Sequence, residues 1–119
     1  MELGTNQKIW VEALKSGKYS QCSGMLVQHN SDGERYCCLG VADKLFELNP
    51  KSFENLFGSN FKEVLGLRGD NGEFAFLFTI EQNGREYKSL TEMNDDGISF
   101  EDIADFIEST PDLIFTHSV

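Results

Sequence analysis

The chain is short and strongly acidic. It has 119 residues, 39% of them apolar, and its 10 Lys and Arg against 20 Asp and Glu give a formal net charge of −10. This composition predicts one small domain over residues 1–119. It disfavours direct binding to nucleic acid or to anionic membranes, because those ligands are held by clustered Lys and Arg.

The N-terminal half predicts a helix, a hairpin and a second helix. Apolar side chains recur with helical spacing over residues 5–16. Asp32-Gly33 supplies a tight turn between two apolar segments, so residues 24–38 predict a hairpin. The second helix covers residues 38–48 and ends at Asn49-Pro50, because the residue before a proline disfavours helical backbone.

The middle of the chain is the least regular part. Residues 51–72 predict only two short helical turns, at 53–57 and 61–65, each followed by a glycine. The sequence leaves open whether this segment is ordered without a partner.

A second hairpin follows this irregular part. Residues 74–81 carry apolar side chains on both faces, which predicts a central strand. Asn83-Gly84 predicts a two-residue turn, and residues 85–90 form the return strand. That register places Glu81 opposite Glu86, which is mildly unfavourable.

The C-terminal part predicts one more helix and a docked tail. Residues 100–109 have an apolar stripe, and Ser99 with Asp102 resembles a capping box. Part of the tail, residues 111–119, can dock as a short strand. Together these elements predict an α+β fold, with one antiparallel sheet built from two β-hairpins and helices packed on one side.

The cysteines indicate a reducing compartment. Cys22, Cys37 and Cys38 are odd in number and two are adjacent, which makes a poor disulfide framework. No apolar run approaches the roughly 20 residues of a membrane span, and the first residues lack the basic and apolar regions of a signal peptide. We therefore expect a cytoplasmic protein with free thiols.

Metal and cofactor sites are not expected. The three cysteines and His29 match no zinc-ligand spacing. Residues 92–97 suggest a calcium loop, but the twelfth loop position falls on Ile103, where a bidentate Glu is required. Weak calcium binding by this acidic segment stays open.

The thiols also suggest a cysteine-dependent enzyme. Cys37 or Cys38 lies where a strand meets a helix, and a helix N-terminus lowers a thiol pKa. The base would be His29 or His117, the two histidines of the chain. A buried structural thiol is the commoner role, so we predict no enzymatic activity and no catalytic residue.

Acidic residues concentrate in the second half. Residues 1–60 carry six Lys and Arg against seven Asp and Glu, whereas residues 61–119 carry four against thirteen. Eight acids and no basic residue lie between Glu92 and Asp112. They are Glu92, Asp95, Asp96, Glu101, Asp102, Asp105, Glu108 and Asp112. Glu101, Asp105, Glu108 and Asp112 follow helical spacing, so we expect an acidic stripe that binds a partner with a basic surface. A solvated face that only keeps the protein soluble is the alternative.

Basic residues suggest a different function. Arg35, Arg68, Arg85 and Lys88 could hold a small nucleotide signal, and Arg85 and Lys88 lie beside aromatic residues. The protein would then sequester that signal, in a pocket that a homodimer could complete. The sequence leaves the oligomeric state open.

Four segments carry a further pattern. They are Trp10-x-x-Ala13-Leu14-x-Ser16-Gly17-x-Tyr19-x-Gln21, Tyr36-Cys37-Cys38-Leu39-Gly40-Val41, Leu90-x-x-Met93-Asn94-Asp95 and Phe100-x-x-Ile103-Ala104-x-x-Ile107. On these segments, over about residues 8–48 and 88–108, the chain resembles a group of short proteins encoded by bacteriophages and prophages. The resemblance implies an infected or lysogenic bacterial cell, and it carries no catalytic residue.

The function expected from these observations is inhibition by binding. Small acidic phage proteins often inhibit host defence, an argument by analogy. We expect a non-enzymatic protein that binds a host defence or nucleic-acid-handling protein through its acidic C-terminal helix. The nucleotide-sequestering protein and the cysteine enzyme are the alternatives.

Overall fold

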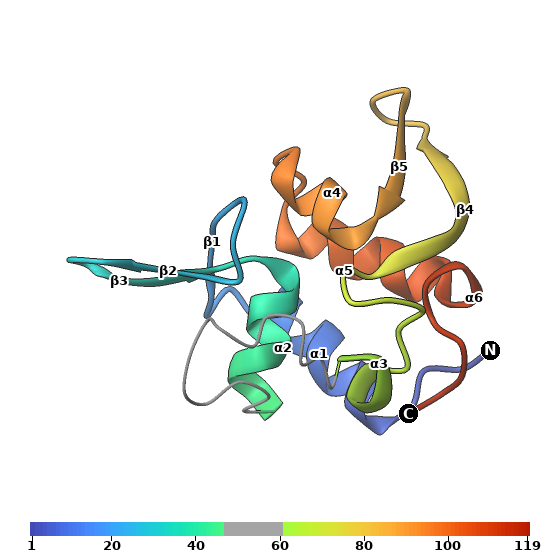
Figure 1. Ribbon diagram of the computed structural model, residues 1–119, viewed down its shortest axis with the longest axis horizontal. Helices are drawn as coiled ribbons and strands as arrows, with labels where there is room; N and C mark the ends of the chain where they lie inside the picture. Colours follow the sequence, from blue (N-terminus) through green and yellow to red (C-terminus); the bar gives the residue numbers. More distant parts are fainter. Residues whose placement is uncertain (47–60) are drawn as a thin grey trace.

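Figure 1 shows the computed structural model, which describes residues 1–46 and 61–119. The helical turn expected at 53–57, the end of the helix expected over 38–48 and residues 51–60 of the irregular segment 51–72 lie outside the described residues. The first part contains α1 (Thr5–Lys15), β1 (Ser20–Gln21), β2 (Val27–Asn30), β3 (Gly33–Tyr36) and α2 (Cys38–Phe46). The second part contains α3 (Phe61–Leu65), β4 (Glu73–Ile80), β5 (Arg85–Ser89), α4 (Leu90–Asp95), α5 (Phe100–Ser109) and α6 (Pro111–Ile114).

The α+β class is confirmed, and so are both hairpins. The sheet arrangement differs from the expected one. Among the described residues, the hairpins lie in two separate sheets, one with strand order β1-β3-β2 and one with β4-β5. The parallel strand β1 takes the free edge of β3, so the second hairpin has no place there. In Figure 1 the two sheets extend from different sides of the helices, which therefore do not cover one face of a single sheet.

Strand β4 is an edge strand, not the predicted central one. Within the described residues its strand partner is β5, and the register shifts between Glu73 and Phe78. The rings of Phe74 and Phe78 pack on Phe106 of α5, with centroid distances of 5.4 and 5.3 Å. In a regular strand Phe76 would share the face of Phe74 and Phe78, but here the register is irregular and Phe76 is 65% exposed. An apolar sequence on both faces therefore does not guarantee burial on both faces.

The turn of this hairpin is longer than predicted. Ile80 pairs with Arg85, so four residues form the loop in place of two. The Asn83 side chain accepts a hydrogen bond from the Arg85 amide at 2.9 Å, and Gly84 takes a φ of +70°. Glu86 lies opposite Thr79. The unfavourable pairing of Glu81 with Glu86 is thus avoided.

The C-terminal tail docks through a short helix and one isolated bridge. Phe115, which follows α6, forms an antiparallel bridge with Leu67. Its ring meets Trp10 edge-on, with a centroid distance of 6.4 Å. The buried amide of Gln7 donates to the carbonyl oxygens of Leu65 and His117, both at 2.8 Å. Helix α1 therefore holds α3 and the tail together.

Asn94 is a buried polar hub between the two halves of the chain. Its side chain is fully buried. The Oδ1 atom accepts from Gln21 Nε2 at 2.8 Å and from the Cys38 amide at 3.2 Å. The Nδ2 atom donates to the Cys22 carbonyl oxygen at 2.7 Å. One side chain on α4 thus joins β1, the loop after it and the first turn of α2, whose amide has no partner within its own helix.

The motif segments meet around the start of α2. Trp10 Nε1 donates to the Cys38 carbonyl oxygen at 2.9 Å, so side chains from α1 and α4 satisfy both backbone groups of Cys38. A Cβ atom at Gly40 would lie 1.9 Å from the Leu26 carbonyl oxygen. Glycine is therefore required for α2 to approach this backbone. These motif residues position secondary structure, and we assign them a structural role.

We predict that Asn94→Ala destabilises the protein by about 2–4 kcal/mol, because it leaves buried amide and carbonyl groups without partners. Urea unfolding followed by circular dichroism measures this change. The exposed amide Gln28 gives a matched control, and Gln28→Ala should change the free energy of unfolding by less than about 0.5 kcal/mol. An unchanged midpoint for Asn94→Ala would show that the hub is dispensable.

Candidate functional site: the outer face of helix α5

Helix α5 presents a buried apolar face and an exposed acidic face. Ser99 caps it, and its Oγ atom accepts from the Asp102 amide at 3.2 Å. The buried side chains are Phe100, Ile103, Ala104 and Ile107. The exposed side chains of the opposite face include Glu101, Asp102, Asp105 and Glu108, and we call these four residues the acidic face.

Lys15 of α1 neutralises part of the acidic face. Its Nζ atom lies 3.6 Å from Asp105 Oδ1 and also contacts the Glu108 carboxylate. The hydrogen bond that Lys15 donates to Glu108, followed by the charges of Glu108 and Asp105, raises the pKa of Lys15. Nothing in the sequence spacing indicates this cation, because Lys15 is about 90 residues away. Glu101 and Asp102 have no ion pair within the described part of the chain.

Asp112 does not extend the acidic face. Helix α5 ends at Ser109, and Thr110 leaves the helical conformation with φ −134° and ψ 50°. Pro111 then starts α6, and the Asp112 carboxylate lies 3.4 Å from the Met1 amino group. The predicted stripe with the spacing 101, 105, 108 and 112 therefore stops at Glu108.

Asp96 belongs to a network that attaches the β4–β5 hairpin to α4. Both carboxylate oxygens lie 2.8 Å from Arg85 Nη1, and Tyr87 Oη donates to Oδ2 at 2.5 Å. Asn83 Nδ2 donates to the same Tyr87 oxygen at 2.9 Å. The hydrogen bonds from Tyr87 and Arg85 lower the pKa of Asp96. Asp96 and Arg85, which the sequence placed in two different candidate sites, thus form an ion pair with each other.

We predict that this network weakens in acid. Because the folded pKa of Asp96 is lowered, its contribution is complete above the unfolded value of about 3.9 and is lost as the pH falls through the folded value. Asp96→Asn should therefore be less stable than wild type at pH 7, with a difference that shrinks below about pH 4. Urea unfolding across this pH range measures it. Tyr87→Phe should show a smaller pH effect, and equal pH profiles for all three proteins would refute the assignment.

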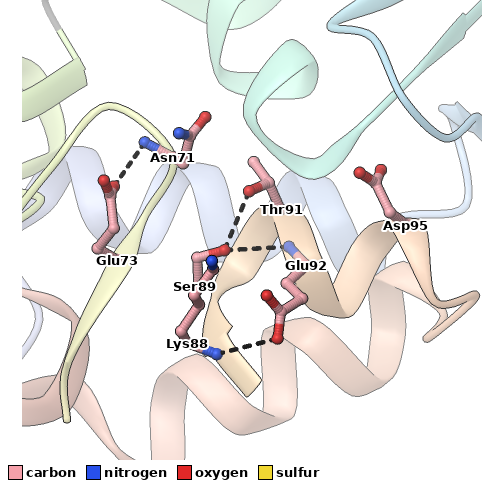
Figure 2. Close-up of a pocket in the computed structure, with 7 residues that line it drawn as sticks. All are labelled: Asn71, Glu73, Lys88, Ser89, Thr91, Glu92 and Asp95. Atoms are coloured by element: carbon pink, nitrogen blue, oxygen red, sulfur yellow. Dashed lines mark hydrogen bonds between the residues drawn. The ribbon is translucent and has the colours of Figure 1, made fainter. Parts of the chain in front are cut away.

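Glu92 and Asp95 lie in a polar surface pocket of about 480 Å³ (Figure 2). The other lining residues are Asn71, Glu73, Lys88, Ser89 and Thr91. Glu92 accepts from the Lys88 amide at 3.3 Å, Glu73 from the Asn71 amide at 2.8 Å, and Asp95 from the Gly24 amide at 2.8 Å. Each of these carboxylates thus satisfies a backbone amide.

A metal ion in this pocket would require an arrangement of several ligand side chains around it. Among residues 1–46 and 61–119, no group of three or more His, Cys, Asp or Glu side chains is arranged to hold a metal ion. Weak calcium binding by the acidic segment therefore has no support from this geometry.

The four predicted basic residues do not form one site. Arg68 donates to the Leu113 and Asp112 carbonyl oxygens at 3.2 and 2.8 Å, and Arg35 lies 3.8 Å from Asp32. Arg85 is bound to Asp96, and Lys88 lines the polar pocket among three carboxylates. The structure therefore provides no cluster of positive charge for a nucleotide in the described residues.

The cysteines are buried free thiols. Burial raises the pKa of Cys37 to about 11, although the Gly40 amide donates to its Sγ atom at 3.3 Å. Burial also raises the pKa of Cys38 well above its usual value. His29 pairs with Glu34 at 2.9 Å, and His117 Nδ1 lies 2.8 Å from Thr116 Oγ1. The geometry therefore favours structural thiols over nucleophiles.

We predict slow alkylation of Cys37 and Cys38 in the folded protein. With a pKa near 11, the thiolate fraction of Cys37 at pH 7.5 is on the order of 100-fold below that of a free cysteine. Iodoacetamide labelling followed by mass spectrometry should show at least this ratio between urea-unfolded and native protein. Labelling of either residue at the unfolded rate would restore the cysteine enzyme as a candidate.

Comparison with known proteins places the chain in a family. Residues 4–64, just over half of the chain, match a family model described as "Domain of unknown function (DUF8296)", and the protein belongs to this family. The matched region contains the tryptophan and double-cysteine segments but not the acidic face. No curated protein and no solved structure matches the chain. No helix in the described ranges has the length and apolar character to cross a membrane.

Proposed function

We propose that this protein is a phage or prophage product that binds and inhibits a basic host protein through the acidic face of α5. The observation that carries the proposal is a pair of exposed carboxylates, Glu101 and Asp102, without a cationic partner in the described residues. They lie in a chain with a formal net charge of −10. The target acts in host defence or handles nucleic acid, and the protein works in the bacterial cytoplasm.

Electrostatics favour this function over a merely solvated surface. The acidic face has four carboxylates and one bridging cation, and the like charges of Glu101 and Asp105, four residues apart, are mildly unfavourable on a helix. A partner with clustered Lys and Arg relieves that repulsion and is attracted over about a Debye length. Proteins that grip nucleic acid carry such clusters to bind phosphates. Carboxylates spaced along one helix can take the place of the phosphates on such a cluster and so block the binding of nucleic acid.

Other parts of the molecule support binding over catalysis. The three thiols are buried, and the predicted basic residues are held by separate acidic or carbonyl groups or lie among carboxylates. The resemblance to short phage and prophage proteins supports the setting. The motif residues lie in the core, so the resemblance supports a shared fold. It gives no information about which surface residues carry the function.

The test is a pull-down from bacterial lysate at low and high salt. Wild type should capture a basic protein, and Glu101→Gln/Asp102→Asn should capture at least about tenfold less, because it removes the two unpaired charges. Capture should also fall steeply in about 0.5 M salt, where screening is nearly complete. The purified partner should then lose its activity when the wild-type protein is added in stoichiometric amount.

A charge-matched variant separates position from total charge. Glu12→Gln/Glu63→Gln removes two exposed carboxylates from α1 and α3, and thus changes the net charge by the same amount. It should capture the partner as wild type does. Equal capture by both double variants, or no partner at all, would reduce the acidic face to a solubility device.

A further inference from the structure

Strand β4 has an open edge with exposed apolar side chains. Within the described residues its only strand partner is β5, which covers one edge. In Figure 1 the other edge of β4 faces outward along the upper part of the strand. Phe76 is 65% exposed and Leu77 is 60% exposed, the two highest values among the large apolar side chains that the structure describes. Such an edge can pair with another extended chain through its unpaired backbone groups.

Two common protections of an edge strand, charged residues and proline, are missing along this stretch, although the register with β5 is irregular between Glu73 and Phe78. Residues 74–80 contain no charged residue and no proline, the two features that commonly prevent edge pairing. Acidic residues flank it at both ends, because Glu73 precedes it and Glu81 follows it. Glu86 is exposed on the neighbouring strand. The edge therefore combines an apolar centre with acidic ends.

The acidic residues at the two ends of the β4 edge favour a basic peptide over a second copy of this chain as its binding partner. In a second copy paired antiparallel on the same edge, Glu73 of one chain would approach Glu81 of the other, and each copy has a net charge of −10. An extended segment with Lys or Arg at both ends meets the same acidic residues with attraction. Eight regular strand residues span about 27 Å, and the irregular register between Glu73 and Phe78 shortens this span, so the two basic positions should lie no more than about eight residues apart.

We propose that the free edge of β4 binds an extended peptide segment of the partner protein by strand addition, with apolar residues over Phe76 and Leu77 and basic residues near Glu73 and Glu81. The inference rests on the proposed function for the basic character of the partner, and it adds a second contact distinct from α5. Backbone hydrogen bonds supply affinity in this mode, and side chains supply specificity.

The probe is a displayed library of random peptides about twelve residues long, selected against the full-length protein. Enriched peptides should have an apolar centre between two Lys or Arg residues. A synthetic peptide of the enriched sequence should bind Phe76→Thr/Leu77→Thr at least about tenfold more weakly, because two apolar contacts are lost. Threonine keeps strand propensity and leaves the charge unchanged.

Matched variants keep the outcome clear. Met25 is 50% exposed outside β4, so Met25→Thr should bind the peptide as wild type does. Glu101→Gln/Asp102→Asn should also retain peptide binding, and its effect on partner capture tests the acidic face separately. Leu77→Thr alone serves if the double variant does not fold.

Three results would overturn the proposal. The first is the absence of any enriched peptide, and the second is enrichment that does not depend on Phe76 and Leu77. The third is a dimer in analytical ultracentrifugation that Phe76→Thr/Leu77→Thr converts to monomer, which would assign the edge to a second copy.

Discussion

The buried amide of Asn94 is the interaction on which the arrangement of the molecule depends. It connects α4 with β1, with the loop after β1 and with the first turn of α2. These contacts join segments more than 50 residues apart in sequence. An amide can donate and accept at once, and no apolar residue of similar size can replace it. Its position fixes how the N-terminal sheet meets the C-terminal helices.

Local signals in the sequence were sufficient for the elements that have strong caps or turns. Helices α1 and α5 and both hairpins were predicted from periodicity, capping residues and Gly-containing turns. Strand β1 has two residues and helix α4 has six, so neither carries a readable period. The prediction of β4 as a central strand was wrong because apolar residues on both faces show what a strand can bury, whereas tertiary packing decides which neighbours it has.

The candidate site was predictable only in part for a similar reason. Sequence spacing placed Glu101, Asp105 and Glu108 on one face of α5, where they are exposed, but it also placed Asp112 there, which lies on α6. It could not indicate that Lys15 would pair with two of them, because the packing of α1 on α5 brings these residues together. Asp96 looked like part of the same surface but is bound by Arg85 and Tyr87. The number of carboxylates in the sequence therefore overstates how many are left to bind a partner.

Ser89 connects the β4–β5 hairpin directly to α4. It is the last residue of β5, and its Oγ atom accepts from the Glu92 amide as the cap of α4. No loop separates the two elements, and the link between Asp96 and Arg85 closes the other end of α4 onto the hairpin. The hairpin is thus fastened at both ends of the helix that carries Asn94, so a change in the packing of the hairpin also bears on the buried amide.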